Sequence, residues 1–195
     1  MMFVMSAISE RRERERAQRH QLIITAAREL AETEGWDAVT TRRLAERVEY
    51  SQPVLYSHFN GKDAIVSAVA LVGFDELAAE LHRARRAAPE LGLALGAVCR
   101  AYLDFATERP ALYQAMFILP TDLKFASAET PPSLRACFDE FVSCFRRDND
   151  RRELFAEVIW SALHGMAVLS DGGRIPLAGQ DERLEFLIAR MTDTV

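Results

Sequence analysis

The sequence lacks a long hydrophobic run that is free of charge. Its longest segment without Asp, Glu, Lys or Arg covers residues 158–170, which is 13 residues and includes His164. A helix that spans a bilayer needs about 20 predominantly apolar residues, so an integral membrane protein is not expected. Residues 1–8 are apolar, but they follow no basic segment and are too short to resemble a signal peptide. We therefore expect a cytoplasmic protein with no membrane partner.

Cysteine is scarce. The chain has three cysteines, Cys99, Cys137 and Cys144, and no two of them form a CxxC pair. An odd number of thiols in apolar surroundings is typical of a reducing compartment, where cysteine behaves as a small core residue. We interpret all three as packing residues. Cys137 and Cys144 are seven residues apart and would share a helix face, so a thiol sensor is the alternative interpretation.

The motifs of common enzyme chemistries are also missing. The sequence has no glycine-rich phosphate loop, no HExxH or GxSxG motif, and no Cys/His cluster with the spacing of metal ligands. The four histidines, at positions 20, 58, 82 and 164, are scattered. The sequence therefore predicts no catalytic residue, no metal site and no cofactor.

The net charge of −5 is unevenly distributed. Residues 1–62 carry ten basic and nine acidic side chains, whereas residues 63–195 carry 14 and 20. Six arginines lie within residues 11–28, where the only acidic residues are Glu13 and Glu15. A basic N-terminal arm ahead of an acidic body indicates that a polyanion is met at the N-terminal end. A run of charges is more often a solvated surface, so this signal needs support from other residues.

Helical periodicity accounts for nearly the whole chain, and no β-hairpin signal, internal repeat or low-complexity segment is found. Apolar residues recur three and four positions apart, and Gly35 ends the first predicted helix. Helices are expected over residues 17–34, 52–58, 62–85, 90–108, 110–118, 132–147, 150–170 and 180–192, with one more short helix after Thr40 or Thr41. The predicted fold is all-α, with an N-terminal three-helix domain and a larger helical body.

Two short helices, each of about two turns, follow the first helix. Thr40 or Thr41 is expected to cap one and Ser51 the other, and the missing N–H of Pro53 is tolerated in a first turn. Their inward apolar residues would be Leu44, Ala45, Val48, Leu55 and Phe59. Two such helices, braced by a longer one, form a helix-turn-helix, whose second helix enters the DNA major groove.

The outward side of these helices carries groups suited to DNA. Gln52 can pair with an adenine edge, Arg42 can reach guanine, and Pro53 can contact a thymine methyl. Thr41, Tyr56 and Lys62 are of the types that bind phosphate oxygens, and Thr41 and Lys62 lie at helix N-termini, which favour anions. Short amphipathic helices of this composition also occur in proteins that bind no DNA, so periodicity alone leaves both interpretations open.

A family resemblance favours DNA binding. Residues 35–48 read GWDAVTTRRLAERV and residues 51–64 read SQPVLYSHFNGKDA, and over residues 18–68 the chain resembles the DNA-binding domain of TetR-family transcriptional regulators. The resemblance implies that Arg42, Gln52 and Pro53 contact bases, and that Thr41, Tyr56, His58 and Lys62 contact the phosphate backbone. The chain departs from the family at the turn, where Glu49 and Tyr50 replace the usual Gly-Val, and at Val54, which replaces a small or hydroxyl residue.

The C-terminal part shows a looser resemblance to the same family. Residues 109–117 read RPALYQAMF and residues 159–167 read IWSALHGMA, which is similar to TetR-family C-terminal domains marked by a Trp...His-Gly segment. The resemblance implies a domain that forms a homodimer and holds an effector.

Bulky apolar residues on helices that would face one another predict a pocket in this body. The candidates are Phe74, Tyr102, Phe105, Met116, Phe117, Phe138, Phe141 and Phe145, with Trp160 and His164 as polar groups on one helix face. Each of these residues is also compatible with a plain core position, and His164 with a core histidine. The helix over residues 150–170 is apolar nearly all round, as expected if it packs on its own subunit and on a partner.

We divide the chain into a basic N-terminal arm (1–16), a helix-turn-helix DNA-binding domain (17–62) and a ligand-binding and dimerisation domain (63–195). The expected function is that of a homodimeric repressor, which binds double-stranded DNA at a palindromic operator and is released by a small, largely apolar effector. The alternative is a helical protein-interaction module that does not bind DNA.

Overall fold

The computed structural model describes residues 2–191. Within them it contains nine α-helices, two short 3₁₀ helices and no β-strand, which confirms the all-α fold. The α-helices are α1 (Met2–Glu34), α2 (Thr41–Arg47), α3 (Gln52–His58), α4 (Lys62–Ala87), α5 (Leu91–Glu108), α6 (Pro110–Phe117), α7 (Pro132–Val142), α8 (Arg152–Asp171) and α9 (Gln180–Met191). The 3₁₀ helices are η1 (Trp36–Ala38) and η2 (Leu177–Gly179).

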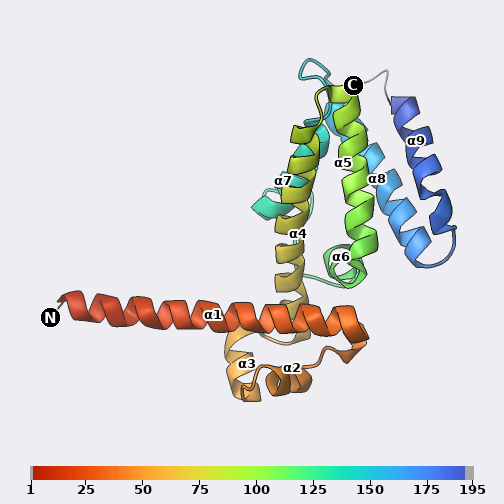
Figure 1. The fold of residues 1–195 in the computed structure, drawn as a ribbon. Coiled ribbons are helices and arrows are strands. Elements are labelled where there is room, and N and C mark those ends of the chain that lie inside the picture. The colour runs from red at the N-terminus through yellow and green to blue at the C-terminus, as the bar shows by residue number, and fades with distance from the viewer. Residues whose placement is uncertain (1, 192–195) are drawn as a thin grey trace.

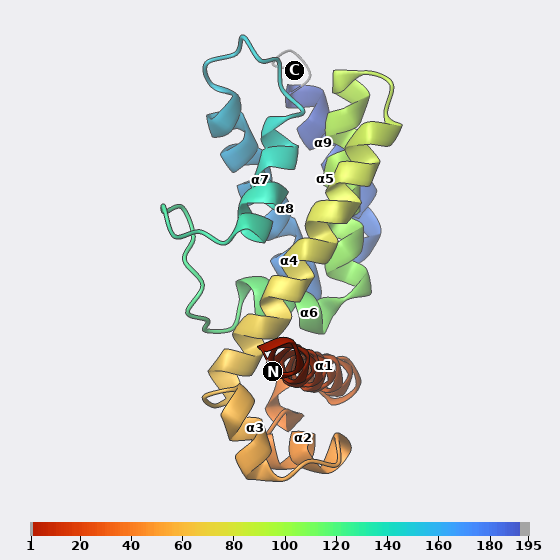
Figure 2. The same ribbon diagram turned by 90° about the vertical axis from the view of Figure 1, so that its left-hand side faces the viewer.

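The molecule has two parts, joined by the long helix α4. Figure 1 shows α2 and α3 beneath α1 at one end, and this head (α1, η1, α2 and α3) is followed by a body (α4 to α9). Figure 2, the same ribbon turned by 90°, shows α4 rising from the head into the body. Within the body α4 packs against α5, α6 and α7, and α8 packs against α5 and α7. A tilt of α4 would therefore change the position of the head relative to the body.

The first helix is longer than the sequence predicts. It begins at Met2, so the predicted start near residue 17 is wrong and the basic N-terminal arm is helical. A hydrogen-bonded ion pair between residues four apart, Arg11 and Glu15, supports the helix in this part of α1. Figure 1 shows the N-terminal part of α1 extending away from the rest of the molecule.

The two short helices of the head depend on the core beneath them. A seven-residue helix is too short to be stable alone, so α2 and α3 need tertiary contacts. The predicted inward residues Leu44, Ala45, Val48, Leu55 and Phe59 are all buried. Burial of a side chain the size of Leu or Phe contributes about 1.5–3 kcal/mol, so these contacts hold both helices in place.

The helix ends of the head explain its turn. Thr40, and not Thr41, is the N-cap of α2, and its hydroxyl accepts a hydrogen bond from the Arg43 N–H at 3.3 Å. Ser51 occupies the N-cap position of α3, but its side chain makes no capping hydrogen bond. Between the helices Glu49 adopts a φ of +57°, and the Tyr50 N–H donates to the Ala45 carbonyl at 2.9 Å. This is the left-handed C-terminal cap that usually uses glycine.

In the body, the predicted helices agree with the observed ones except at some ends. The helix predicted over residues 132–147 ends at Val142, because the next hydrogen bonds, Cys144 to Phe141 and Phe145 to Val142, span three residues and form turns. The crossing of α4 and α6 is close at Gly73, where a Cβ atom would lie 2.6 Å from the Met116 sulfur. None of the helices within residues 2–191 is long and apolar enough to cross a membrane.

Candidate nucleic-acid interface and cavity

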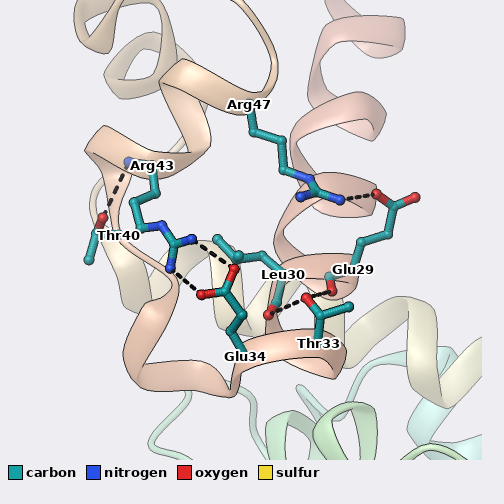
Figure 3. Close-up of polar contacts among 7 residues, drawn as sticks. All are labelled: Glu29, Leu30, Thr33, Glu34, Thr40, Arg43 and Arg47. Atoms are coloured by element: carbon teal, nitrogen blue, oxygen red, sulfur yellow. Dashed lines mark hydrogen bonds and ion pairs between the residues drawn. The ribbon is translucent and has the colours of Figure 1, made fainter.

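Two ion pairs fix α2 against α1. Figure 3 shows Arg43 of α2 with both guanidinium nitrogens on Glu34, at 2.8 and 2.9 Å, and Arg47 of α2 reaching Glu29 at 2.9 Å. The hydrogen bond from Arg43 lowers the pKa of the Glu34 carboxyl. Pairs this exposed contribute little stability one by one, but together they set the direction in which α2 points from α1.

The outward side of α3 is free of the rest of the molecule. Gln52 and Pro53 are exposed, and Tyr56 is 55% exposed although it is a large aromatic residue. Val54, between them, is half-buried. The structure therefore presents three of the four predicted contact residues of α3 at the surface, whereas Leu55 of the same helix is buried.

Arg42 on α2 is exposed and makes an ion pair with Glu46 one turn later. The Arg42 Nε atom lies 3.0 Å from the Glu46 carboxylate, and 78% of the arginine side chain is accessible. An exposed pair at this spacing is worth about 0.3–0.5 kcal/mol. Arg42 can therefore exchange Glu46 for a DNA group at little cost.

Lys62, a predicted phosphate contact, makes a hydrogen bond inside the protein. Its ammonium group donates to the Trp36 carbonyl, and the side chain is half-buried at the N-terminus of α4. The sequence did not indicate this contact. An ammonium group has three N–H donors, so two remain for a phosphate oxygen. Thr41, the other helix-terminal candidate, is half-buried in the first turn of α2.

His58, at the end of α3, is half-buried against α1. Its ring centroid lies 6.0 Å from that of His20, which stacks on Phe59 at 4.3 Å. Burial lowers the pKa of His58, and His20 and the arginines of α1 lower it further. His58 is therefore neutral near pH 7, and its role toward a phosphate is limited to a neutral hydrogen bond.

The body encloses a cavity of about 570 Å³ between α4, α5, α7 and α8. Six of the ten residues predicted for a pocket line it: Phe74, Tyr102, Phe117, Phe138, Phe141 and Trp160. Its other lining residues are Leu77, Phe125, Ala126, Ser127, Ala128, Thr130, Leu134, Arg135, Cys137 and Glu157. The lining is mainly aromatic and aliphatic, which is typical of sites for small apolar molecules.

The other four predicted pocket residues do not line this cavity. Phe105 is fully buried beneath Arg109, whose guanidinium carbon lies 4.7 Å above its ring. Met116 packs on Gly73 where α6 crosses α4, and Phe145 stacks on Phe155. His164 lies behind the lining, where its ring contacts Phe117 at 5.6 Å and its Nδ1 lies 2.7 Å from the Tyr113 hydroxyl. Helical periodicity identified these residues as inward-facing but could not tell core from cavity.

The loop over residues 119–131 supplies lining residues that the sequence did not indicate. Phe125 makes an edge contact with Phe74 at 5.9 Å, and Ala126 has a φ of +49°. Hydrogen bonds between Ser127 and Thr130 close the turn that follows. The sequence does show an aromatic residue, Phe125, in a loop bounded by prolines. Whether this residue lines the cavity depends on the tertiary fold.

Besides the hydroxyls of Ser127 and Thr130 on the loop, the polar groups at the cavity fall into two sets. Arg135 and Glu157 are exposed lining residues, so they lie where the cavity meets solvent. Deeper, the Trp160 N–H donates to the Tyr102 hydroxyl at 3.1 Å, which lies 2.8 Å from the Tyr113 hydroxyl. Tyr113 in turn lies 2.7 Å from Nδ1 of His164. We call these four side chains the relay.

Helix α6 connects the relay to the head. Tyr113 belongs to α6, and at the start of the same helix the Ala111 carbonyl accepts from the Trp36 indole N–H at 2.7 Å. The adjacent Leu112 N–H donates to Glu32 of α1 at 3.2 Å. One eight-residue helix therefore contacts both the residues behind the cavity and the centre of the head.

The three cysteines are buried. Burial raises the pKa of Cys137 and Cys144 to about 12 and raises that of Cys99 as well. The reactive thiolate is therefore a minor form at neutral pH, which favours the packing interpretation over a thiol sensor. Within the described part of the chain, no group of three or more His, Cys, Asp or Glu side chains is arranged to hold a metal ion.

Comparison with known proteins gives matches in both parts of the chain. Residues 23–69 match the family model for bacterial regulatory proteins of the tetR family. Residues 95–193 match the model for the tetracyclin repressor-like C-terminal domain. The HTH-type transcriptional regulator YobS of Bacillus subtilis, itself uncharacterized, is 33% identical over 102 residues, which span 50% of this chain and 51% of YobS.

Solved structures share the fold over most of the chain. A bacterial regulatory protein in the tetR family from Rhodococcus RHA1 superposes with a TM-score of 0.60 and 18% identity, over 90% of this chain and 97% of that one. FadR from Bacillus subtilis, solved in complex with stearoyl-CoA, gives a TM-score of 0.64 and 12% identity, over 86% and 97%. The chain belongs to the TetR family of transcriptional regulators, with an N-terminal helix-turn-helix that binds DNA.

Proposed function

We propose that the protein is a homodimeric repressor that binds a palindromic operator and is released by a small amphipathic effector held in the cavity. The observation that carries this proposal is the exposed side of α3, where Gln52, Pro53 and Tyr56 are held outward by a buried core and by ion pairs to α1. A DNA-binding regulator works where the DNA is, which supports a cytoplasmic location. No catalytic role is assigned to any residue.

The geometry of the head supports the DNA contacts expected from the sequence. We assign base contacts to Arg42, Gln52 and Pro53, and phosphate contacts to Thr41, Tyr56, His58 and Lys62. Within this scheme the N-terminal arm at the start of α1 adds affinity without sequence preference, because its arginines meet phosphates and not bases. We keep the division into an arm, a DNA-binding domain (17–62) and a ligand-binding and dimerisation domain (63–195).

Dimerisation is assigned to α8 and α9. Both helices carry large apolar residues at the surface, among them Leu154, Val158 and Leu169 on α8 and Phe186 on α9. A three-helix head reads one half-site, and a two-fold partner would place its own α3 in the major groove about 34–36 Å away. Apolar residues on two neighbouring helices suit such a self-complementary surface.

The effector is assigned to the cavity from its size and chemistry. Its interior is lined by seven aromatic residues and a few aliphatic ones, and Arg135 at the solvent edge could pair with an anionic group. This combination supports an amphipathic molecule with an aromatic or acyl part inside. The presence of stearoyl-CoA in the FadR structure is consistent with such a ligand class.

Release of DNA would follow from movement of α6 and α4. A ligand that displaces Tyr113 or Phe117 shifts α6, and α6 holds Trp36 and Glu32 of the head through hydrogen bonds. A preference of about 1–3 kcal/mol for the shape that does not fit DNA weakens operator binding 5- to 150-fold, and DNA weakens ligand binding by the same factor.

Selection of bound sequences from a random DNA pool tests the proposal, because it tests binding and yields the operator. With that operator, Gln52→Ala should cost about 1–3 kcal/mol per half-site and have little effect on random DNA. Gln21→Ala, at an exposed glutamine of α1, is the matched control and should leave the ratio of the two affinities unchanged. Lys62→Ala should weaken both DNAs alike and reduce the salt dependence.

The rival function, a helical interaction module, predicts a different outcome. Such a module would enrich no sequence and would bind random duplex DNA neither at low nor at high salt. An equal loss on operator and random DNA for Gln52→Ala would leave DNA binding in place and overturn the base contact of this residue.

A further inference from the structure

The number of protons in the relay sets the direction of its hydrogen bonds. Each tyrosine hydroxyl has one proton and the Trp160 indole can only donate. If Nδ1 of neutral His164 accepts, Tyr113 donates to His164 and Tyr102 donates to Tyr113, so every proton has an acceptor. If Nδ1 carries a proton, it donates to the Tyr113 hydroxyl, and Tyr113 donates to Tyr102. The Tyr102 O–H then has no acceptor left in the relay. An unpaired buried donor is costly, so the first direction is the resting one.

The resting direction determines what the cavity offers to a ligand. Tyr102 and Trp160 line the cavity, whereas Tyr113 and His164 are not part of its lining. The Tyr102 oxygen accepts from Trp160 and keeps a second lone pair, while its proton is used by Tyr113. At this buried position the protein therefore has an acceptor to offer and no free donor.

We propose that the cavity selects ligands that carry a hydrogen-bond donor, such as a hydroxyl or N–H group, over ligands of the same shape that carry only an acceptor. The inference rests on the proposed role of the cavity as the effector site. A ligand hydroxyl donates to Tyr102 with the relay unchanged. A ketone can only accept a hydrogen bond, so Tyr102 binds it only after the Tyr102–Tyr113 and Tyr113–His164 hydrogen bonds have both reversed. This reversal requires a proton on Nδ1 of His164.

The surroundings of His164 make this reversal dependent on pH. Tyr113 and Phe117 of α6 face its ring, Tyr102 of α5 follows in the relay, and Cys137 of α7 lies close to Tyr102. Burial raises the pKa of both tyrosines and of Cys137, so all three groups are neutral. Burial lowers the pKa of His164, and no charged side chain acts on it. Acid therefore protonates His164 alone within this group and reverses the relay.

Equilibrium dialysis with two matched pairs of probes tests the inference: fluoren-9-ol with fluoren-9-one, and octan-2-ol with octan-2-one. Each pair differs only at the carbon that bears oxygen. At about pH 8, where histidine is neutral, each alcohol should bind about three- to tenfold more tightly than its ketone, which is the contribution of one neutral hydrogen bond. The ketones should gain affinity relative to the alcohols only well below about pH 6.5, the ordinary pKa of histidine, because burial lowers the pKa of His164.

Two variants that each lose one hydroxyl separate the positions of the relay. In Tyr102→Phe the accepting oxygen is gone, and the ratio of the two affinities should fall to about one at every pH. In Tyr113→Phe the Tyr102 proton loses its acceptor and becomes free, so the ketones should bind about three- to tenfold more tightly than they bind the native protein. If Tyr113→Phe does not fold, the pH series on the native protein decides.

The outcomes distinguish this inference from the proposed function. If no probe of either pair binds the native protein, the cavity is not a ligand site and both fail. If the probes bind but each alcohol and its ketone have equal affinity, the donor preference is wrong and the proposed function stands. The same holds if the ratio of the two affinities is unchanged in Tyr102→Phe.

Discussion

Glu49 occupies a backbone conformation that an L-residue adopts at a cost. Its φ of +57° is required by the turn between α2 and α3, where the Glu49 and Tyr50 N–H groups close the C-terminus of α2. The Glu49 side chain is exposed. Sequence reasoning identified the absence of glycine here, and the structure shows that the turn keeps its geometry without it.

Glu49→Gly should stabilise the head. Glycine removes the steric cost of a left-handed residue, about 1–2 kcal/mol, and adds about 0.5–1 kcal/mol of unfolded-state entropy, so a net gain of about 0.5–1 kcal/mol is expected. Urea denaturation followed by circular dichroism measures it. Glu49→Val is the control, because a β-branched residue is least compatible with this φ and should destabilise. A loss of stability in Glu49→Gly would contradict the assigned conformation.

The histidines of the head make its stability dependent on pH. Burial lowers the pKa of both His20 and His58 below the ordinary value. The unfolded state therefore binds protons at a higher pH than the folded state, so the free energy of unfolding falls as pH drops through this window. We expect a lower urea midpoint at about pH 5.5 than at pH 7.5. The double variant His20→Gln, His58→Gln should reduce that difference in midpoint. An unchanged difference would refute the assignment of the pH dependence to these two histidines.

At the scale of elements, periodicity predicted the helices whose apolar residues recur at helical spacing and bury a face. The boundaries of α3 agree with the prediction, because Ser51, Pro53 and the buried Leu55 mark them in the sequence. The first half of α1 was missed, because its support comes from charge pairs and not from apolar spacing.

The candidate sites show the same division. Outward residues of α3 could be predicted, since a short helix with one buried face leaves the opposite face free. The cavity could be predicted only in part, because a helix pattern shows that Phe105 and Phe141 both face inward but not which of them meets a void. The contact of Lys62 with Trp36 and the relay join residues far apart in the chain, and no local pattern encodes them.

Helix α6 of the body contacts the head, and Trp36→Phe should weaken this contact. The variant removes the indole N–H that donates to the Ala111 carbonyl, and the loss of one such hydrogen bond costs about 0.5–1.5 kcal/mol. Amide hydrogen exchange in α2 and α3 should become faster, while amides of α8 keep their rates. Glu32→Gln is the control, because its side-chain oxygen still accepts from Leu112 and exchange should change little. Equal acceleration in α8 would indicate global destabilisation instead.

At the scale of the whole molecule, α8 and α9 carry the apolar surface on which the proposed dimer would form. Phe186 is 63% exposed and borders a groove that Met166 and Leu187 also line. Charged residues, Glu182, Arg183 and Arg190, surround it. An apolar centre with a charged rim is typical of a protein interface.

Phe186→Glu should disrupt the dimer without unfolding the subunit. Burial of a phenylalanine contributes about 1.5–3 kcal/mol, and a two-fold interface contains the residue twice, so the dimer should weaken at least about tenfold. Sedimentation equilibrium measures it. Leu93→Glu, an equally exposed apolar residue on α5, is the control and should leave the dimer intact. A native protein that is monomeric at micromolar concentration would refute the assembly.

The two tryptophans of the chain stand at opposite ends of the connection between cavity and head. Trp160 lines the cavity and donates to Tyr102, and Trp36 is buried where α6 meets η1. Indole emission shifts with the polarity around the ring, so the native protein carries two intrinsic fluorescent reporters. With Trp36 replaced, the remaining emission follows occupancy of the cavity. With Trp160 replaced, the remaining emission comes from Trp36 and reports changes where α6 meets η1. The delay between the two signals after rapid mixing then gives the time between ligand binding and the structural change at the head.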